Sequence, residues 1–492
     1  MPQIGAEEDM NEAQRQKPYK LFINGNWQEA SSGQTFATYN PATEAEIAQV
    51  ARGDMADIEQ AVVAARQALD GPWGRLKPKE RSRLLYAVSQ SLEQQVDELA
   101  RLETLDNGKP LPQARKEVLG AARYFEYYAG AADKIHGEQI PLGPDVVNFT
   151  IREAMGVTAH IVPWNKPLNI LARSLAPALA AGNTAVIKPA EQTPLTALKL
   201  AEQLAELDFP AGVVNIVTGY GEEAGVALAG HTDIDHLTFT GSAATGRAVM
   251  KAAAEHIKPV LLELGGKSPL IVFADADLDL VIREAIKGIV TNCGQMCSAG
   301  SRILVMDSVK DALLEKLVAA IKQLHIGPGI ESPDVGPLVS AVQYGRVTGH
   351  IDIATSEGAH ILYGGSRPAH LPQGYFIEPT LFDNVVPDMY IAQREVFGPV
   401  LSILTFHDEA EALRIANQVP YGLVAGIFTQ DISRALRLAT RIQAGQIFIN
   451  EFYTGDEETP FGGYGQSGFG REKGLAALDH YTQIKNVAIR LH

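Results

Sequence analysis

Two cysteines, Cys293 and Cys297, are the only thiols of the chain, and Cys297 is the better candidate for a nucleophile. It lies in the segment Gly294–Gly300, where small residues would let a substrate approach the thiol closely. A thiolate is a strong nucleophile at neutral pH, whereas a lone buried cysteine usually acts as a small apolar residue. Both roles stay open for Cys297, and Cys293 is expected to be a buried neighbour. Two cysteines without a nearby histidine pair fall short of a four-ligand site, so no metal site is predicted.

A glutamate and an asparagine stand at the ends of predicted strands. Glu263 closes an apolar strand, and burial between Leu262 and Leu264 would raise the pKa of its carboxyl group and suit it to act as a general base. Asn165 follows the predicted strand 160–162, and its side-chain amide is a neutral donor that could stabilise an oxyanion. The alternatives are a solvated glutamate at a strand end and an asparagine that only shapes a turn.

Three further segments have features of a nucleotide site. Lys188 and Glu191 follow the predicted strand 185–187, where an acid and a base could hydrogen-bond ribose hydroxyls. Glycines at 219–221 and 239–246 lie at strand-to-helix junctions, where the backbone can approach a pyrophosphate at a helix N-terminus. Neither glycine segment matches the G-x-G-x-x-G pattern, so plain turns remain the alternative.

These candidate residues lie in a chain where helical patterns alternate with short β-branched runs. Such alternation favours βαβ units with parallel sheets, and therefore an α/β fold. This alternation of strand and helix patterns occurs in two parts of the chain, which meet near residues 264–266, so two α/β domains are expected. Segments 139–153 and 480–492 do not follow this alternation. They are predicted as peripheral strands, which pair within their own domain or with another subunit. Strands are predicted at 21–23, 160–162, 185–187, 213–217, 237–240, 303–305 and 401–406, and helices at 84–105, 194–207, 222–229, 311–325 and 409–417.

The composition narrows the function classes. The chain has 492 residues, which allows roughly three domains at ~150 residues each. A formal net charge of −16 argues against a dedicated nucleic-acid or anionic-membrane binder, because phosphate contacts need clustered cations. Two cysteines exclude a disulfide framework, and no apolar run reaches the roughly 18 residues of a transmembrane helix. Residues 1–17 are expected to form a flexible tail without a targeting signal, and the protein is expected to be cytoplasmic.

Several long motifs, in this order, resemble the aldehyde dehydrogenase superfamily from about Lys20 to Val487. Cys297 follows Glu263 by 34 residues, which is also the usual spacing in that family. The motifs are PWN at 163–165, KPAEQTP at 188–194, FTGS at 239–242, ELGGK at 263–267, GQMCSAGSR at 294–302, EVFGPV at 395–400 and PFGGYGQSGFGRE at 460–472.

The resemblance implies a fold with a Rossmann-like NAD-binding domain, an α/β catalytic domain and a small β oligomerisation arm. The arm implies a homo-oligomer, either a dimer or a tetramer. The other implied partner is a small-molecule aldehyde substrate, with no role for nucleic acid or a membrane. The implied boundaries are 18–134 and 155–264 for the NAD-binding domain, 265–465 for the catalytic domain, and 135–154 and 480–492 for the arm.

By resemblance, Cys297 is the nucleophile, Glu263 is the general base, and Asn165 forms an oxyanion hole with the backbone N–H of Cys297. The implied activity is NAD-dependent oxidation of an aldehyde to its carboxylic acid, through a thiohemiacetal and a thioester on Cys297 that water then hydrolyses. Two alternatives stay open. One is a CoA-acylating relative, against which Glu263 argues. The other is a non-catalytic structural protein on the same fold, against which the three intact residues argue.

The resemblance also implies a nicotinamide cofactor. Lys188 and Glu191 would hold the adenosine ribose, and Ser242 would touch the pyrophosphate. Glu395 would bind the nicotinamide ribose, and Phe397 would pack near the nicotinamide. NAD is expected, because Glu191 would repel the 2′-phosphate of NADP, which remains the weaker expectation. The other implied cofactor residues are Ile161, Pro163, Trp164, Gly221, Phe239, Gly241, Gly246 and Leu264.

One position departs from the family pattern, because Lys166 stands where an aromatic residue usually follows PWN. If the next segment is helical, Lys166, Asn169 and Arg173 share one face and form a basic rim to the aldehyde tunnel. The expected substrate then carries a carboxylate or another polar group distal to the aldehyde. The alternative is that Lys166 extends to solvent and Arg173 pairs with a neighbouring acid. Met296 and Ser298 flank the thiol and complete the tentative substrate residues.

Overall fold

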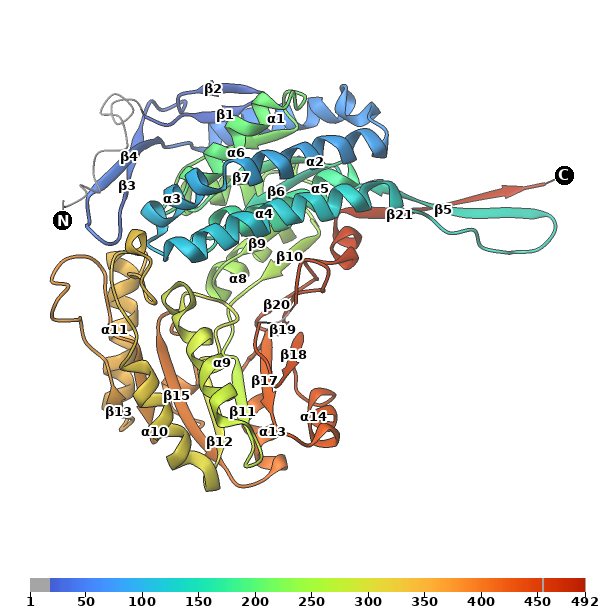
Figure 1. The fold of residues 1–492 in the computed structure, drawn as a ribbon. Helices are drawn as coiled ribbons and strands as arrows, with labels where there is room; N and C mark the ends of the chain where they lie inside the picture. The colour runs from blue at the N-terminus through green and yellow to red at the C-terminus, as the bar shows by residue number, and fades with distance from the viewer. Residues whose placement is uncertain (1–17, 454, 492) are drawn as a thin grey trace.

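The computed structural model describes residues 18–453 and 455–491, which form two α/β lobes and a projecting two-stranded arm (Figure 1). Both lobes contain parallel strands flanked by helices, which confirms the expected α/β class. The expected tail, residues 1–17, lies outside the described residues. No helix within the described ranges is long and apolar enough to cross a membrane.

The first lobe is built on an eight-stranded sheet in which the central strands run parallel. Its order places β6 next to β9, so the strand order reverses at the middle of the sheet, where α/β folds place their ligands. In sheet order the strands are β2 (Asn26–Gln28), β1 (Leu21–Ile23), β8 (Val214–Ile216), β7 (Thr184–Lys188), β6 (Val157–Ile161), β9 (His236–Thr240), β10 (Val260–Glu263) and β20 (Gly468–Phe469).

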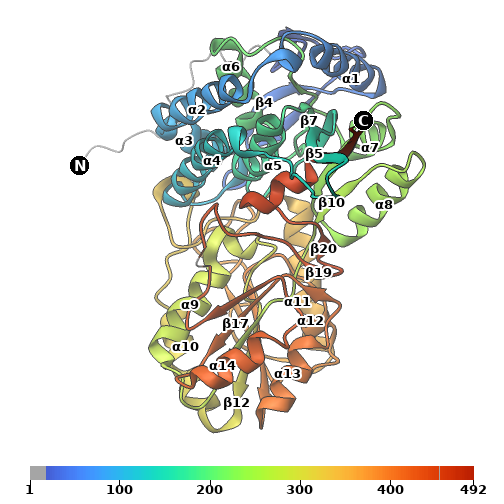
Figure 2. The same ribbon diagram turned by 90° about the vertical axis from the view of Figure 1, so that its right-hand side faces the viewer.

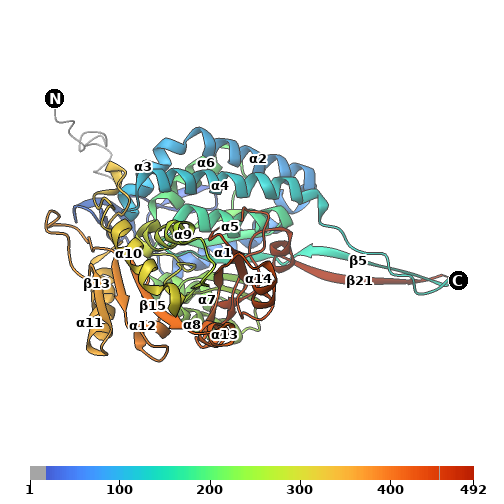
Figure 3. The ribbon, with the colours of Figure 1, turned by 60° about the horizontal axis from the view of Figure 1, so that its bottom comes forward.

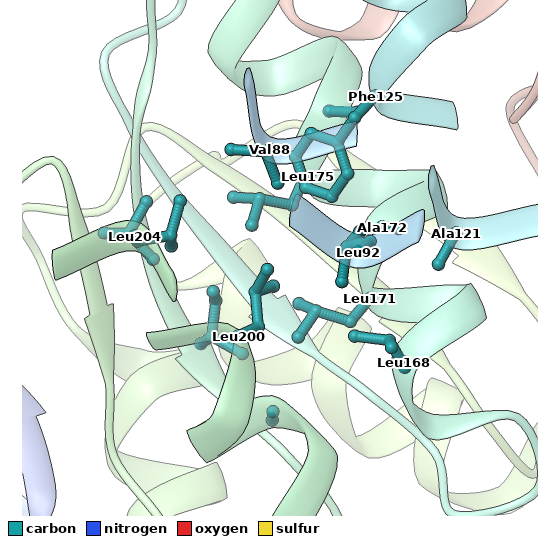
Figure 4. Packing of buried hydrophobic residues seen from close by; sticks show 14 of the residues in the cluster. Val88, Leu92, Ala121, Phe125, Leu168, Leu171, Ala172, Leu175, Leu200 and Leu204 are labelled. Atoms are coloured by element: carbon teal, nitrogen blue, oxygen red, sulfur yellow. The ribbon is translucent and has the colours of Figure 1, made fainter. Parts of the chain in front are cut away.

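Helices cover both faces of this sheet because its strands are apolar on both sides. In β7, Ala185 and Ile187 join the core on one face and Val186 joins the core on the other. The first core includes α2 (Pro78–Gln94), α3 (Val96–Asn107), α4 (Leu111–Ala131), α5 (Pro167–Ala181) and α6 (Leu195–Glu206). Part of it is seen in Figure 4, where the labelled residues are Val88, Leu92, Ala121, Phe125, Leu168, Leu171, Ala172, Leu175, Leu200 and Leu204. The second core includes α1 (Met55–Asp70), α7 (Val226–Gly230) and α8 (Ala243–Ala254).

The second lobe lies below the first in Figures 1 and 2 and has a seven-stranded sheet. The chain passes from the first sheet to the second between β10 and β11 (Pro269–Val272), near the expected residues 264–266. The strands are, in sheet order, β13 (His360–Tyr363), β14 (Thr380–Asp383), β15 (Val400–Phe406), β12 (Arg302–Met306), β11 (Pro269–Val272), β17 (Val424–Phe428) and β18 (Gln446–Ile449). Its helices are α9 (Leu278–Val290), α10 (Lys310–Ile321), α11 (Ala341–Ser356), α12 (Tyr390–Gln393), α13 (Glu409–Asn417) and α14 (Ile432–Ala439).

Three predicted helices differ in detail from those observed. The helical pattern at 84–105 spans two helices, because the backbone leaves the helical conformation at Gln95, between α2 and α3. The pattern at 222–229 is divided between a π-helical turn, Gly221–Gly225, and α7. The helix predicted at 311–325 ends early, because tighter turns replace the α-helical hydrogen bonds after Ile321.

The arm consists of β5 (Val146–Ala154) and β21 (Thr482–Arg490), which pair antiparallel over their whole length. Figures 1 and 3 show that this ribbon projects away from both lobes. The segments 139–153 and 480–492 are predicted as peripheral strands, and within one chain residues 146–154 and 482–490 form this pair. Residue 492 lies outside the described residues. Two more short pairs complete the fold: β3 (Thr35–Tyr39) with β4 (Glu46–Ala51), and β16 (Tyr421–Gly422) with β19 (Tyr464–Gly465).

Candidate active site

Cys297 lies where two cavities meet. It follows a short segment, Thr291–Gly294, in which Asn292 and Cys293 adopt left-handed backbone conformations with φ of 48° and 55°. A cavity of about 670 Å³ and a smaller one of about 210 Å³ are both lined by Cys297 and Asn165. Cys293 is buried in the apolar core of the second lobe, as expected, and burial raises the pKa of its thiol. Only Cys297 is therefore presented to both cavities.

The surroundings of Cys297 oppose a permanently charged thiolate. Burial raises the pKa of the Cys297 thiol to about 11, and the positive charge of Arg173 offsets part of that rise. Glu263 and Glu395 push the pKa further up, and Lys166 pulls it down. Burial thus favours the neutral thiol, and the two cations favour its ionisation.

Hydrogen bonds fix both the side chain and the backbone carbonyl of Asn165. It lies between the end of β6 and the start of α5, and its Nδ2 donates to the carbonyl of Gln295 at 3.0 Å. Its own carbonyl accepts from Lys109 Nζ at 2.9 Å and from Asn292 Nδ2 at 2.7 Å. An amide nitrogen carries two N–H groups, so one donor remains for a group beside Cys297.

Glu263 ends β10 and is almost completely buried, with 2% of its surface exposed. Neither carboxylate oxygen has a hydrogen-bond partner among the described residues. Burial raises the pKa of Glu263 well above its usual range, and the neighbouring Glu472 raises it further against the pull of Arg173 and Arg471. Its side chain lines the smaller cavity together with Cys297. A carboxyl group left without a partner in such a place is suited to exchange protons with a water molecule.

The smaller cavity opens at the carboxyl edge of the first sheet. The strand register aligns the ends of β7, β6, β9 and β10, because Ile161 pairs with Lys188 and with Phe239, and Glu263 pairs with Thr240. Of the residues implied for the cofactor, those that line this cavity are Pro163, Trp164, Gly241, Ser242, Glu395 and Phe397.

The other implied cofactor residues lie around this edge without lining that cavity. Lys188 donates to Glu191 at 2.9 Å just beyond β7. Gly246 allows α8 to pack closely on Leu264, since a Cβ there would lie 2.6 Å from a Leu264 methyl carbon. Ser242, which does line the cavity, also caps α8 and accepts from the backbone N–H of Thr245 at 3.1 Å. The remaining residues of this group are Ile161 at the end of β6, Phe239 in β9 and Gly221 at the start of the π-helical turn.

Glu395 and Phe397 reach this cavity from the second lobe. Glu395 Oε1 accepts from the backbone N–H of Gly266 at 3.1 Å, and burial raises the pKa of Glu395 to about 7. A side chain at Gly265 would overlap the Glu395 carboxylate. The Phe397 ring packs edge-on against Trp164, with the ring centres 5.2 Å apart. The two lobes thus close on one small cavity through these contacts.

Six residues that line this cavity are absent from the predicted site residues: Thr240, Gly265, Gln343, Arg346, His350 and Val396. Three of them, Gln343, Arg346 and His350, come from α11. Gln343 Nε2 donates to the carbonyl of Phe397 at 2.8 Å. Their i, i+3, i+7 spacing would have placed them on one helix face, but nothing in the sequence showed that this face meets the first lobe.

Every tentative substrate residue lines the larger cavity: Lys166, Asn169, Arg173, Met296 and Ser298. The segment after Lys166 is helical, as the shared-face prediction required, and Lys166 is the residue that precedes α5. Its Nζ lies 3.7 Å from Glu117 Oε1, and Asn169 Nδ2 donates to the Glu117 carbonyl at 3.1 Å.

Arg173 forms an ion pair with Glu472 and lies over the Phe461 ring at 5.3 Å. Arg173 thus has the acidic partner that the alternative interpretation required. The lining also includes Tyr124, Phe448 and Tyr453, so the cavity is partly apolar and partly charged.

Comparison with known proteins gives a single family. The sequence matches the aldehyde dehydrogenase family model over residues 27–487. It is 46% identical to aldehyde dehydrogenase 1 of Tanacetum cinerariifolium over 96% of this chain and 95% of that protein. It is 44% identical to hydroxyisobutyraldehyde dehydrogenase of Mycolicibacterium austroafricanum over 96% of this chain and 94% of that protein.

A solved structure agrees with these sequence matches. The NAD⁺ complex of aldehyde dehydrogenase from Bacillus cereus superposes with a TM-score of 0.96 at 44% identity, covering 98% of both chains. An alignment of sequence and fold along nearly the whole chain leaves one conclusion: the protein belongs to the aldehyde dehydrogenase family.

Proposed function

We propose that this protein oxidises an aldehyde to its carboxylic acid with NAD⁺, using Cys297 as a covalent nucleophile. The observation that carries the proposal is that Cys297 and Asn165 line both cavities. An aldehyde that enters through the larger cavity meets the thiol at the wall of the smaller one, where Glu263 lies. The relative from Bacillus cereus, whose solved structure is an NAD⁺ complex, supports the choice of cofactor.

The first half of the reaction belongs to Cys297 and Asn165. The thiolate adds to the aldehyde carbon and forms a thiohemiacetal, whose oxyanion receives hydrogen bonds from Asn165 Nδ2 and the Cys297 backbone N–H. When bound, NAD⁺ supplies the acceptor for the hydride that leaves this carbon. Collapse of the oxyanion then leaves a thioester on Cys297.

Glu263 acts in the second half of the reaction, the hydrolysis of the thioester. Its carboxylate takes a proton from a water molecule, the water oxygen adds to the thioester carbonyl, and the carbon–sulfur bond breaks to release the carboxylic acid and the Cys297 thiolate. Because the pKa of Glu263 is raised, its basic form becomes more populated as the pH rises. Hydrolysis of the thioester should therefore accelerate with pH over the range in which Glu263 loses its proton.

The residues present fit NAD⁺ better than NADP⁺. Glu191 lies beside the carboxyl edge of the sheet and is paired with Lys188. Burial alone would raise the pKa of Glu191, but the Lys188 charge outweighs it and lowers the pKa, so Glu191 is ionised. A carboxylate there accepts hydrogen bonds from ribose hydroxyls and repels a 2′-phosphate. NADP⁺ is expected to be the weaker cofactor.

We also propose an aldehyde with a polar or anionic group distal to the carbonyl. Lys166 is one quarter exposed in the larger cavity, while the Arg173 charge is balanced by Glu472. Lys166, whose Nζ lies 3.7 Å from Glu117 Oε1, is the cation next to Asn165 among those that line this cavity, and we propose that it meets such a group. The test compares kcat/KM for a semialdehyde acid and an alkanal of equal length, in the unchanged protein and in Lys166→Phe. The ratio should shift toward the alkanal in the variant, and an unchanged ratio would refute the idea.

The activity itself is tested with a panel of aldehydes, each with NAD⁺ and NADP⁺, by following the absorbance of the reduced nicotinamide. Turnover without CoA is expected, since Glu263 provides a base for hydrolysis. A strict requirement for CoA would instead assign the protein to the acylating relatives. No activity on any aldehyde, together with unchanged cellular function in Cys297→Ser, would favour a structural role.

We propose a homo-oligomer, a dimer or a tetramer, joined through the arm. The arm projects from the body (Figure 3). It exposes apolar side chains, and exposed apolar surface of this kind is typical of subunit contacts. The expected cytoplasmic location rests on the two free thiols, which suit a reducing compartment. Sedimentation tests the first proposal, and cell fractionation tests the second. The exposed apolar residues are Val147, Ile151, Ile484, Ile489 and Leu491.

A further inference from the structure

We propose that Lys109 is a positioning residue for the oxyanion donor Asn165. Lys109 follows α3 and Gly108, and only 1% of its surface is exposed. Its Nζ donates to the backbone carbonyl of Asn165 at 2.9 Å. The inference rests on the proposed function, because it assigns Lys109 a role that acts only through Asn165.

The ammonium group of Lys109 is fully satisfied. A lysine has three N–H donors, and here they meet Glu103 Oε1 at 2.9 Å, Glu117 Oε2 and the Asn165 carbonyl. Burial alone would lower the pKa of Lys109, but the two glutamates outweigh it, so the pKa is raised and the group stays charged. Because each N–H of the Lys109 ammonium group has its own acceptor, the position of Nζ relative to the Asn165 carbonyl is fixed.

The same loop is held at neighbouring points. Asn107 Nδ2 donates to the Trp164 carbonyl at 2.8 Å, so two residues at the end of α3 hold two successive carbonyls. Asn292 Nδ2 also donates to the Asn165 carbonyl, at 2.7 Å. Asn292 belongs to the left-handed segment before Cys297, so the nucleophile loop and the oxyanion loop share this carbonyl.

The consequence for catalysis is geometric. The Asn165 amide must keep one N–H directed at the oxyanion while the other donates to Gln295. A displacement of about 1 Å in such a group can lower the rate on the order of 10²-fold. Lys109 does not line either cavity, so its loss should leave the binding of aldehyde and NAD⁺ nearly intact while kcat falls.

The test is a double-mutant cycle on kcat with Lys109→Met and Asn165→Ala. We expect Lys109→Met alone to lower kcat by about 10–10²-fold, with the KM for NAD⁺ and the rate of Cys297 alkylation unchanged. In the Asn165→Ala background, Lys109→Met should have little further effect, because the group on which it acts is absent. Lys109→Arg, which retains the charge and several donors, should recover part of kcat.

Lys258→Met is the matched control. Lys258 is also a buried lysine that donates to backbone carbonyls, those of Ala229 and His231, but it lines neither cavity. Its replacement should leave kcat unchanged. If Lys109→Met does not fold because two carboxylates lose their partner, the cycle is carried out with Lys109→Met/Glu103→Gln/Glu117→Gln, which has no buried charge there. Its reference is Glu103→Gln/Glu117→Gln, because Glu117 lines the larger cavity.

Three outcomes would overturn the inference. An unchanged kcat in Lys109→Met would show that Asn165 keeps its position unaided. Equal losses from Lys109→Met in both backgrounds would show an effect that does not pass through Asn165. An unchanged kcat in Asn165→Ala would overturn the oxyanion role in the proposed function as well, so failure of the two proposals can be told apart.

Discussion

Arg173 and Glu472 form an ion pair inside the protein, with 8% and 1% of their side chains exposed, at the wall of the cavity that contains Cys297. Burial alone would lower the pKa of Arg173, but the Glu472 carboxylate outweighs it and raises the pKa, so the guanidinium stays charged. That charge lowers the pKa of the Cys297 thiol. The pair therefore places a buried positive charge near the nucleophile.

Removing this charge should make Cys297 less reactive. Arg173→Met/Glu472→Gln removes both charges, which avoids leaving one buried carboxylate unpaired at a cost of about 3–5 kcal/mol. The pKa of Cys297 should rise, and alkylation by iodoacetamide at constant pH should slow by up to roughly tenfold for each unit of pKa. Arg173→Lys, which keeps the charge, is the control. Equal alkylation rates in all three proteins would contradict a role for Arg173 at the thiol.

Glu263→Gln should stabilise the fold while it abolishes thioester hydrolysis. The pKa of Glu263 is raised in the folded protein, so its carboxylate form is disfavoured there. Folding stability contributed by this group is full below its unfolded pKa and is lost as the pH rises through its folded pKa. The variant should gain about 1–3 kcal/mol at alkaline pH, and little at pH 4. Denaturant unfolding at the two pH values measures this, and a larger gain at pH 4 would contradict it.

Gly265→Ala should weaken the cofactor site. A Cβ at Gly265 would overlap the Glu395 carboxylate, which must then leave its place near Gly266. Such overpacking costs about 1–3 kcal/mol, and the KM for NAD⁺ should rise on the order of tenfold. Gly230→Ala is a matched control, since nothing lies within 4 Å of a Cβ there. A KM for NAD⁺ as low as that of the control would refute the assignment of Glu395.

Charges on the arm should break the oligomer without unfolding the chain. Ile484 and Ile489 lie on β21 and expose 63% and 46% of their surface, so lysines can replace them without strain. Ile484→Lys/Ile489→Lys should sediment as a smaller species than the unchanged protein. Ile432→Lys, at an equally exposed isoleucine in α14, should not change the species. Identical sedimentation of all three would exclude the arm as the contact.

The sequence allowed the candidate residues to be located, because each motif lies at a strand end or in one loop. Cys297, Glu263 and Asn165 are placed around shared cavities by three such segments. The proposed role of Lys109 could not be predicted, since it depends on the Asn165 carbonyl, which Lys109 meets only in the folded chain. The same holds for Arg346, which reaches the smaller cavity from the other lobe.

The sequence also did not show which acidic residue balances the charge of Arg173. The face shared by Lys166 and Arg173 follows from helical spacing, and the structure shows that helix. The acid that balances Arg173 lies near the other end of the chain, at Glu472, in the segment after β20 joins the first sheet. Local periodicity therefore predicts which side chains face a cavity, while their net charge depends on distant partners.

The central claim is that Cys297 carries the acyl group during turnover. The most direct measurement is intact-protein and peptide mass spectrometry of Glu263→Gln after mixing with an aldehyde and NAD⁺. We predict one equivalent of reduced cofactor, an added mass equal to the acyl group on the Cys297 peptide, and no adduct in Cys297→Ala. Continued turnover with unmodified Cys297, or an acyl group on another residue, would contradict the mechanism.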